Sequence, residues 1–272
     1  MSKIITDKQD LTYLNWSHAR HSSGTAGTFL KSETTLNGKK TYYKLSNFDS
    51  EKGIIGHECI NEIIVDRLLD ILKVEHLAYE LIHADIQIDG KTYETWLCAS
   101  QDFKKRGETK AALDNYYQIY KSGNISHYDF CRDMGWQKYI DTMLAVDYLI
   151  LNRDRHGANI EVLRNARKKT LRIAPLFDHG LSLLCSCYSE EAIEQFDISS
   201  DKPCQNFIGS RSTLDNLKLI QNKGTLFEGK LATSDKDILF KDLEHALSPM
   251  HREKIWNMIW TRWCKYEDLC NH

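Results

Sequence analysis

The chain of 272 residues lacks several features that would place it in a specialised class of protein. No apolar run reaches the length of a transmembrane helix, and residues 1–10 are polar, so neither membrane insertion nor secretion is predicted. The eight cysteines form no repeated C-x-x-C pairs, which disfavours an ordinary zinc site and indicates free, reduced thiols. Together these absences predict a cytoplasmic protein with no membrane partner.

Net charge and proline content are also low. A formal net charge of −2 argues against a general basic surface, so direct binding of nucleic acid is not expected. The densest basic run, residues 164–169, is interpreted as a solvated hairpin turn. Only three prolines interrupt the chain, no internal repeat is present, and 42% hydrophobic residues suffice for one sizeable core.

One polar segment has the spacing of a phosphoryl-transfer site. Asp154 is followed five residues later by Asn159, and Asp178 opens the tripeptide Asp-His-Gly further on. In kinases an Asp of this spacing receives the acceptor hydroxyl, while the Asn and the second Asp hold Mg²⁺. His156, inside the loop, either orients the Asp or contacts phosphate, or else is a structural histidine that hydrogen-bonds the loop backbone.

The order of the surrounding segments strengthens this prediction, because an isolated D-x-x-x-x-N match is frequent by chance. Residues 144–151 form an apolar run of helical character, and residues 159–163 and 171–176 resemble short strands joined by a charged turn. Helix, catalytic loop, β-hairpin and metal-binding Asp is the order required in a kinase C-lobe. The helical C-terminal pattern, 238–247 and 250–269, is interrupted at Pro249 after Ser248, a plausible helix cap.

The first half of the chain contains a candidate catalytic lysine and its carboxylate. Asn37-Gly38 is a strong hairpin signal between residues 29–31 and 41–45, and it places Lys44 in the second strand. A solvated lysine is the alternative. The helical pattern of residues 55–72 carries Glu58 and Glu62 one turn apart. Glu62 is favoured as the partner of Lys44, because it lies nearer the middle of the helix and in its more apolar part.

A second hairpin, with strands 81–88 and 92–98, surrounds the turn Asp89-Gly90 and is predicted to complete an antiparallel sheet. Residues 99–107 then resemble a hinge, in which backbone groups from Cys98 to Ser100 would pair with an adenine edge. A plain exposed connection fits this segment equally well.

A small Gly-containing turn, residues 21–28, is a candidate phosphate-covering loop. Backbone N–H groups of Ser23, Gly24 and Thr25 would approach the phosphates, since glycine permits the positive φ angles of such a turn. A flexible linker is the alternative.

These residues together resemble the HipA-like family of bacterial serine/threonine kinases, in its compact form without an N-terminal subdomain. The resemblance rests on Asn61-Glu62, on the loop Asp154 to Asn159 and on Pro175-Leu176-Phe177-Asp178. It implies that Asp154 is the catalytic base or the group that orients the acceptor, that Lys44 contacts phosphate, and that Asn159 and Asp178 bind Mg²⁺. It also implies an antitoxin or DNA-binding regulator as partner, and inhibitory autophosphorylation at Ser22 or Ser23.

The expected fold is therefore α+β and bilobal, with an antiparallel-sheet N-lobe over residues 1–99 and a mainly helical C-lobe over residues 100–272. The expected function is ATP- and Mg²⁺-dependent phosphoryl transfer to serine or threonine of a protein substrate, as in a toxin or regulatory kinase. Two alternatives remain open at this point, a kinase of small molecules or lipids and a non-catalytic nucleotide-binding module.

Overall fold

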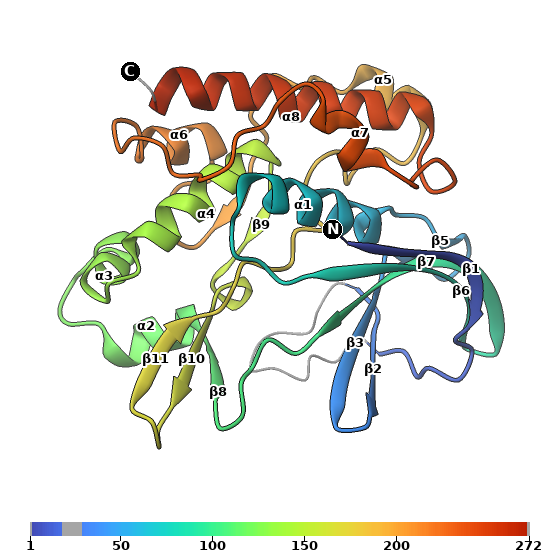
Figure 1. Ribbon diagram of the computed structural model, residues 1–272, viewed down its shortest axis with the longest axis horizontal. Coiled ribbons are helices and arrows are strands. Elements are labelled where there is room, and N and C mark those ends of the chain that lie inside the picture. The colour runs from blue at the N-terminus through green and yellow to red at the C-terminus, as the bar shows by residue number, and fades with distance from the viewer. Residues whose placement is uncertain (1, 18–28, 271–272) are drawn as a thin grey trace.

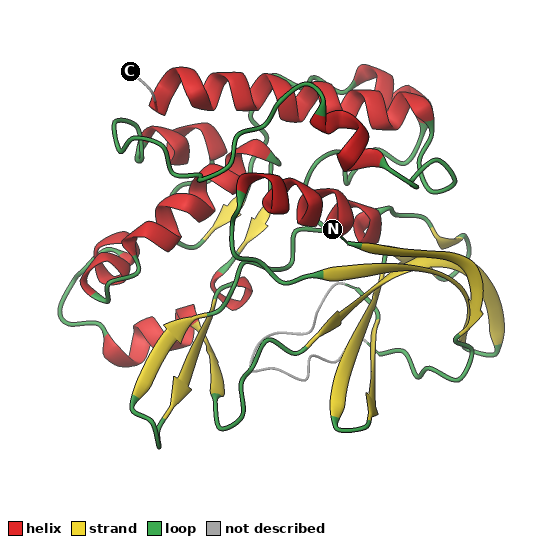
Figure 2. Cartoon of the chain, viewed as in Figure 1, coloured by secondary structure: helices red, strands yellow, loops and turns green. Residues whose placement is uncertain are grey.

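The computed structural model describes residues 2–17 and 29–270. Its layers are visible in Figure 1 and Figure 2. A curved sheet occupies one side of the molecule, a smaller sheet lies across from it, and helices cover both from above. The candidate phosphate loop, including Ser22, Ser23, Gly24 and Thr25, lies outside the described residues.

The larger sheet has five strands in the order β1-β6-β7-β3-β2. Its central strands are long and partly buried, so they hold side chains in defined positions on both faces of the sheet. The strands are β1 (Lys3–Asp10), β2 (Lys31–Leu36), β3 (Lys39–Leu45), β6 (Tyr79–Ile88) and β7 (Lys91–Gln101). The short strands β4 (Phe48–Asp49) and β5 (Gly53–Ile54) pair with each other beside it.

The prediction of an antiparallel sheet is wrong at one edge, because β1 pairs with β6 in parallel. The sheet is therefore mixed. Residues of β1 are mostly exposed and polar, so this strand lacks the apolar alternation that marks a strand in sequence. Its place at the sheet edge comes from long-range pairing with β6.

Both predicted hairpins are present with their turns at the expected residues. Asn37 and Gly38 have φ angles of 51° and 75°, and Asp89 and Gly90 have 49° and 79°. Two successive positive φ angles characterise the two-residue turns that match the twist of antiparallel strands, which explains the Asn-Gly and Asp-Gly pairs. The register that follows places Lys44 opposite Cys98 of β7.

Helix α1 (Glu58–Leu72) begins three residues later than the predicted start at Ile55 and packs between the large sheet and the upper helices. It is buried on almost all sides, including Glu58, Asn61 and Glu62. Its leucines and isoleucines join the main hydrophobic core with residues of the C-terminal helices. Burial on this scale holds the helix and its polar side chains in fixed positions.

The remaining chain forms a small sheet and a set of helices. The sheet has the order β11-β10-β8, with β8 (Thr109–Ala112), β10 (Glu161–Asn165) and β11 (Thr170–Ile173). The helices before the predicted catalytic loop are α2 (Leu113–Tyr120), α3 (His127–Asp133) and α4 (Gln137–Leu149). The loop itself contains β9 (Asp154–Arg155) and a 3-10 turn (Gly157–Asn159), and β12 (Gln205–Asn206) pairs with β9 in parallel.

The C-terminal helices are α5 (Glu190–Gln195), α6 (Thr213–Lys218), α7 (Asp235–Phe240) and α8 (Pro249–Cys270). The predicted helix over 238–247 is wrong in its second half, because Asp242 has a φ of 60° that ends helical geometry there. The predicted cap is present, since the backbone N–H of His251 donates to Ser248 Oγ. Within the described residues, no helix is long and apolar enough to span a membrane.

Two buried histidines connect α1 to α8 and make stability depend on pH. The rings of His57, before α1, and His251, in α8, lie 4.4 Å apart. Burial lowers the pKa of His57 to about 3, with a further contribution from His251, and burial lowers the pKa of His251 to about 4. Both side chains are therefore neutral in the folded protein at neutral pH.

Because both pKa values lie below the ordinary value of 6.5, the unfolded chain binds more protons in acid. The contribution of the two neutral histidines to the free energy of unfolding is thus fully present above pH 6.5. It is lost as the pH falls toward 4, by up to about 1.4 kcal/mol per pH unit for each histidine. Urea unfolding of the wild type and of a His57→Gln/His251→Gln variant, across this pH range, measures the effect. Equal acid sensitivity of the two proteins would contradict the assignment.

Candidate active site

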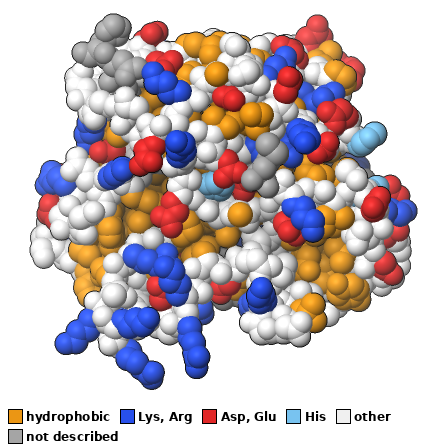
Figure 3. Space-filling view, in the orientation of Figure 1, with side chains coloured by type: hydrophobic (Ala, Val, Ile, Leu, Met, Phe, Trp, Pro, Cys, Tyr) orange, Lys and Arg blue, Asp and Glu red, His pale blue; other side chains and the backbone are white. Residues whose placement is uncertain are grey.

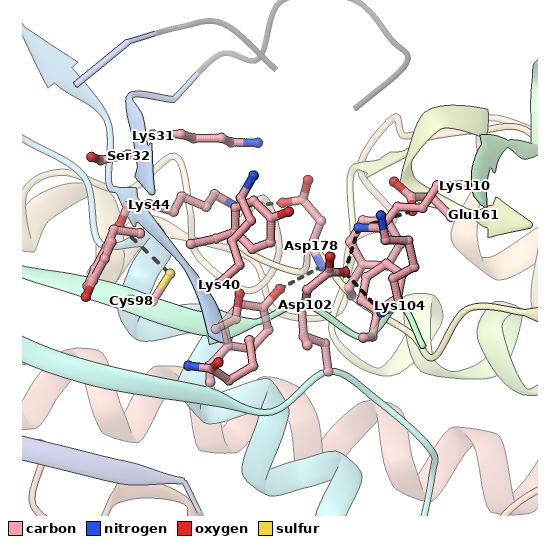
Figure 4. Close-up of a pocket in the computed structure, with 18 of the residues that line it drawn as sticks. Lys31, Ser32, Lys40, Lys44, Cys98, Asp102, Lys104, Lys110, Glu161 and Asp178 are labelled. Atoms are coloured by element: carbon pink, nitrogen blue, oxygen red, sulfur yellow. Dashed lines mark hydrogen bonds and ion pairs between the residues drawn. The ribbon is translucent and has the colours of Figure 1, made fainter. Parts of the chain in front are cut away.

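A cavity of about 530 Å³ lies between the large sheet and the small sheet. Its lining comes from β3 and β7 on one side, from β8 and β10 on the other, and from the connection between β7 and β8. Figure 4 shows Lys44 and Cys98 at one end of this cavity and Lys110 and Glu161 at the other, with Asp178 between. Its size is that of a small-molecule binding site.

Three charged side chains that the sequence singled out meet at the base of this cavity. Lys44 Nζ lies 2.9 Å from Glu62 Oε1 and 2.5 Å from Asp178 Oδ1. The expected contact of Lys44 with Glu62 is therefore present. Glu58, the other carboxylate considered, instead accepts a hydrogen bond from the backbone N–H of Asn47.

The two carboxylates keep Lys44 charged although its side chain is only 12% exposed. Burial by itself lowers the pKa of Lys44, but the charges of Asp178 and Glu62 outweigh it and raise the pKa well above the ordinary 10.5. Glu62 is fixed in turn, because its second oxygen accepts the backbone N–H of His179 at 2.8 Å. This arrangement presents a permanent cation beside an oxygen ligand in a cavity.

The segment around Asp178 has an unusual backbone. Asp178 has a φ of 59°, which is uncommon for a residue with a side chain, and its backbone N–H donates to the hydroxyl of Tyr79. Gly180 passes so close to α1 that an added Cβ would lie 3.1 Å from Glu58 Cβ and 3.2 Å from Lys44 Nζ. Glycine at this position therefore permits the loop to approach the lysine. The side chain of His179 is buried, and burial lowers its pKa well below 6.5, so it is neutral.

The predicted catalytic loop gathers its polar groups around Asp154. The amide of Asn159 donates to the backbone oxygen of Asp154 at 2.9 Å, and Asn152 Oδ1 accepts the backbone N–H of Asp154. Nδ1 of His156 accepts the backbone N–H of Ala158, as in the structural alternative, and its Nε2 lies 3.7 Å from Asp154 Oδ2. The loop is thus held in one conformation by its own side chains.

Sequence reasoning missed the residue that joins this loop to Asp178. Arg155 is completely buried, and its guanidinium makes two-pronged contacts with Asp147 of α4 at 2.9–3.2 Å. The same group donates to the backbone oxygens of Asn159 and of Phe177, which directly precedes Asp178. Asn152 completes the set by donating to Asp147. An arginine next to a candidate catalytic Asp was the available signal, but its burial was not readable from the sequence.

The prediction for the hinge backbone needs correction. Cys98 and Ser100 do line the cavity, but β7 continues to Gln101 between β3 and β6. Alternate residues of a central antiparallel strand bond to neighbours on opposite sides, so the backbone groups of Cys98 and Ser100 are used within the sheet. The first backbone groups beyond the sheet are those after Gln101. Asp154, His156 and Asn159 are not among the described residues that line the cavity.

The donor set fits Mg²⁺. No three His, Cys, Asp or Glu side chains within the described residues gather to form a metal cage. Mg²⁺ in nucleotide sites keeps several waters and binds through one or two protein oxygens together with phosphates. The carboxylate of Asp178 and the amide oxygen of Asn159 are oxygen donors of the kind that Mg²⁺ takes.

No protein-family model matches this chain, and no curated protein matches it by sequence. Among solved structures, the Helicobacter pylori proinflammatory kinase CtkA is similar, with a TM-score of 0.60, 17% sequence identity and 96% of each chain covered. HipA, solved with HipB and operator DNA of a Shewanella oneidensis toxin–antitoxin system, matches with a TM-score of 0.43 and 13% identity, over 92% of this chain and 60% of that chain.

The likeness to CtkA shows that the chain has the α+β fold of a kinase, and it agrees with the predicted resemblance to HipA-like kinases.

Removal of the Arg155 charge is expected to destabilise the protein strongly. In an Arg155→Met variant, Asp147 remains buried without its cation, which costs about 3–5 kcal/mol of the free energy of unfolding. Arg132→Met is the matched control, because Arg132 pairs with Asp129 at an exposed site and should lose about 1 kcal/mol or less. Urea denaturation measures both, and similar losses in the two variants would contradict the role assigned to Arg155.

Proposed function

We propose that this protein is an ATP- and Mg²⁺-dependent kinase that phosphorylates serine or threonine of a protein. The observation that carries the proposal is the contact of Lys44 with Glu62 and Asp178 at the base of a cavity of about 530 Å³. A lysine on a strand, paired to a helix carboxylate and to a metal-binding Asp, is the arrangement that kinases use to hold nucleotide phosphates. The kinase fold of the structural neighbour supports the proposal.

In this proposal residues 1–99 form the N-lobe and residues 100–272 the C-lobe, with ATP between them. The position of the cavity supports this division, because the large sheet and the small sheet both line it. Lys44 binds the α- and β-phosphates, and Cys98 and Ser100 contact the base through their side chains. Ser23, Gly24 and Thr25 are proposed to cover the phosphates, and His156 to contact them beside Asp154.

Asn159 and Asp178 are proposed to hold Mg²⁺, which when bound neutralises the negative charge of the phosphates. Asp178 contacts Lys44, which supports the proposal that both groups act on the same phosphates. The raised pKa of Lys44 keeps it cationic over the whole physiological range, so its contact with phosphate does not depend on pH. Glu62 holds the lysine in place and does not need to move.

Asp154 is proposed to orient the acceptor and to take its proton. The acceptor hydroxyl oxygen forms a bond to the γ-phosphorus, the bond between that phosphorus and the β,γ-bridging oxygen breaks, and ADP leaves. The hydroxyl proton passes to the Asp154 carboxylate. The hydrogen bonds from Asn159 and to Asn152 fix the backbone of Asp154 and thereby its distance from the acceptor.

A protein acceptor is proposed on the family resemblance, together with an antitoxin or DNA-binding protein as a regulatory partner. Incubation with γ-labelled ATP, Mg²⁺ and a cell lysate tests the acceptor class. Label in acid-precipitated protein, recovered as phosphoserine or phosphothreonine, supports the proposal. Label confined to lipid or to small molecules would replace the acceptor but retain the kinase.

Substitutions at the site separate catalysis from nucleotide binding. Asp154→Asn is expected to lower the rate of phosphoryl transfer by about 10²–10⁴-fold, the scale of a positioned base, while ATP binding persists. Asp178→Asn and Lys44→Met are expected to abolish transfer and to weaken ATP binding, as removal of metal with EDTA does for the wild type. Radiolabel transfer and equilibrium binding of a fluorescent ATP analogue provide the two measurements.

Asp133→Asn is the matched control, because this carboxylate is exposed on α3 and lies outside the site. It is expected to retain full activity. Full activity in Asp154→Asn or Asp178→Asn would exclude the proposed mechanism.

We also propose that the kinase phosphorylates itself on Ser22 or Ser23 and is slowed as a result. The reason is the family resemblance and the position of both serines beside the Gly24 loop. A phosphate adds a charge of about −1.5 to −2 near the ATP phosphates, so ATP affinity falls by repulsion. Mass spectrometry after incubation with ATP and Mg²⁺ detects the modification. Transfer to another substrate without phosphate on either serine would rule it out.

A further inference from the structure

Exposed basic side chains gather on one edge of a chain whose net charge is only −2. Three of them, Lys104, Lys105 and Arg106, lie on the connection between β7 and β8. Four more, Arg164, Arg167, Lys168 and Lys169, lie at the end of β10 and in the turn before β11. Figure 3 shows Lys and Arg side chains projecting from this edge, at the lower left of the view. We call these seven residues the basic surface.

The two loops of the basic surface are fastened together and form one continuous face. The side chain of Asn165 donates to the backbone oxygen of Arg106, and Thr109 Oγ1 donates to the backbone oxygen of Arg164 at 3.2 Å. Residues Thr109–Ala112 and Glu161–Arg164 are paired as antiparallel strands below them. The two loops therefore lie together, and their charges share one face of the molecule.

The carboxylates nearest to this surface are already used by other cations. Asp102 pairs with Lys110 at 3.1 Å, and Glu108 pairs with Arg172 at 2.8 Å, which lowers the pKa of Glu108. Residues 103–107 and 164–169 contain no acid. Within the part of the chain that the structure describes, none of the seven basic side chains makes an ion pair. Their like charges thus repel one another and attract an anionic partner.

Apolar side chains border the same surface. Leu171 lies directly opposite Arg164 in the strand pair and is 37% exposed. The Tyr120 hydroxyl accepts from Arg164, and Ile119 beside it on α2 is 71% exposed. A partner that fits carries carboxylates together with aliphatic side chains. Tyr120 is itself 48% exposed, so an aromatic face is present, but the aliphatic side chains Leu171 and Ile119 have no counterpart in a phosphate backbone and favour an acidic polypeptide.

The basic surface also reaches the mouth of the nucleotide cavity. Lys104 belongs to the basic surface and also lines the cavity. Lys110, on β8, lines the cavity as well. A polypeptide bound along residues 104–106 and 164–169 therefore lies beside the bound nucleotide.

We infer that the basic surface binds an acidic, leucine-containing segment of the protein substrate. That the bound protein is a substrate rests on the proposed kinase activity. Residues 164–169 were interpreted from the sequence as a solvated hairpin turn, and this inference adds a binding role to that turn. The solvated turn is one half of a surface completed by residues 104–106, which lie about sixty positions earlier in the chain.

The test uses a short fluorescent peptide of glutamate and leucine as the probe, with a lysine and leucine peptide of equal length for comparison. The variant Lys105→Glu/Arg167→Glu/Lys168→Glu reverses charge on both loops without touching a residue that lines the cavity. Lys138→Glu/Lys230→Glu/Lys265→Glu makes the same charge change at exposed lysines elsewhere. Fluorescence anisotropy of the full chain at low and at physiological salt gives the affinities.

The wild type is expected to bind the acidic peptide and not the basic one, with an affinity that falls as salt rises. The charge reversal on the basic surface is expected to weaken binding by about tenfold or more, and the control variant to leave it within about twofold. Binding of an ATP analogue should be equal in all three proteins, which also reports that each is folded. The neutral variant Lys105→Gln/Arg167→Gln/Lys168→Gln should show an intermediate loss.

Equal peptide affinity in the wild type and the charge-reversed protein would overturn the inference. So would tighter binding of a single-stranded RNA of the same charge, lost in the same variant, because the surface would then serve nucleic acid. Peptide binding without phosphoryl transfer to any protein would leave this inference standing and remove the proposed function. Phosphoryl transfer to proteins at the same rate in the wild type and the charge-reversed variant would overturn this inference and leave the proposed function standing.

Discussion

The buried ion pair between Arg155 and Asp147 is the interaction on which the geometry of the site depends. The arginine lies inside the protein and contacts a helix, the catalytic loop and the strand end before Asp178. A charge in this environment is tolerated only with complete compensation, so the three segments cannot separate without exposing or orphaning it. The pKa of Arg155 reflects this balance, since burial lowers it and Asp147 raises it further, leaving it above the ordinary value. One residue thereby places Asp154 and Asp178 in a fixed relation.

The opposite half of the site relies on a second cluster of charges, around Lys44. Its two carboxylates come from elements far apart in sequence, α1 and the segment after β11. In the proposed function, the ammonium group that binds the phosphates is already oriented by Glu62. Preorganisation of this kind avoids the reorientation of dipoles during reaction, which is the main cost that an electrostatic site has to remove.

Local patterns in the sequence predicted local structure well. The Asn-Gly and Asp-Gly pairs located both hairpin turns, because a positive φ at two successive residues is a requirement of the turn itself. The choice of Glu62 over Glu58 agreed with the observed contact of Lys44, because the apolar spacing of α1 shows which turn lies deepest. The spacing of Asp154, Asn159 and Asp178 located two segments that the guanidinium of Arg155 joins in the structure.

Features that depend on distant pairing were not readable. The strand β1 has the composition of a polar terminus and becomes a strand only beside β6. The extension of β7 to Gln101 depends on the presence of β3 on one side and β6 on the other, and it displaced the predicted hinge. Arg155 and Asp147 are charged residues whose burial reverses the usual expectation for their types. Sequence periodicity did not show that Arg155 and Asp147 are enclosed.

At Asp178 the left-handed backbone favours glycine, whereas the contact with Lys44 requires a carboxylate. A non-glycine residue at a φ of 59° carries a conformational penalty of about 1–3 kcal/mol that the surrounding contacts have to overcome. Glycine would adopt the same backbone without penalty but would remove the carboxylate that faces Lys44. The same substitution would leave the buried ammonium of Lys44 with Glu62 as its remaining carboxylate, so the ion pair with Asp178 offsets part of the backbone strain. The strain at residue 178 is therefore tied to the presence of a carboxylate against Lys44.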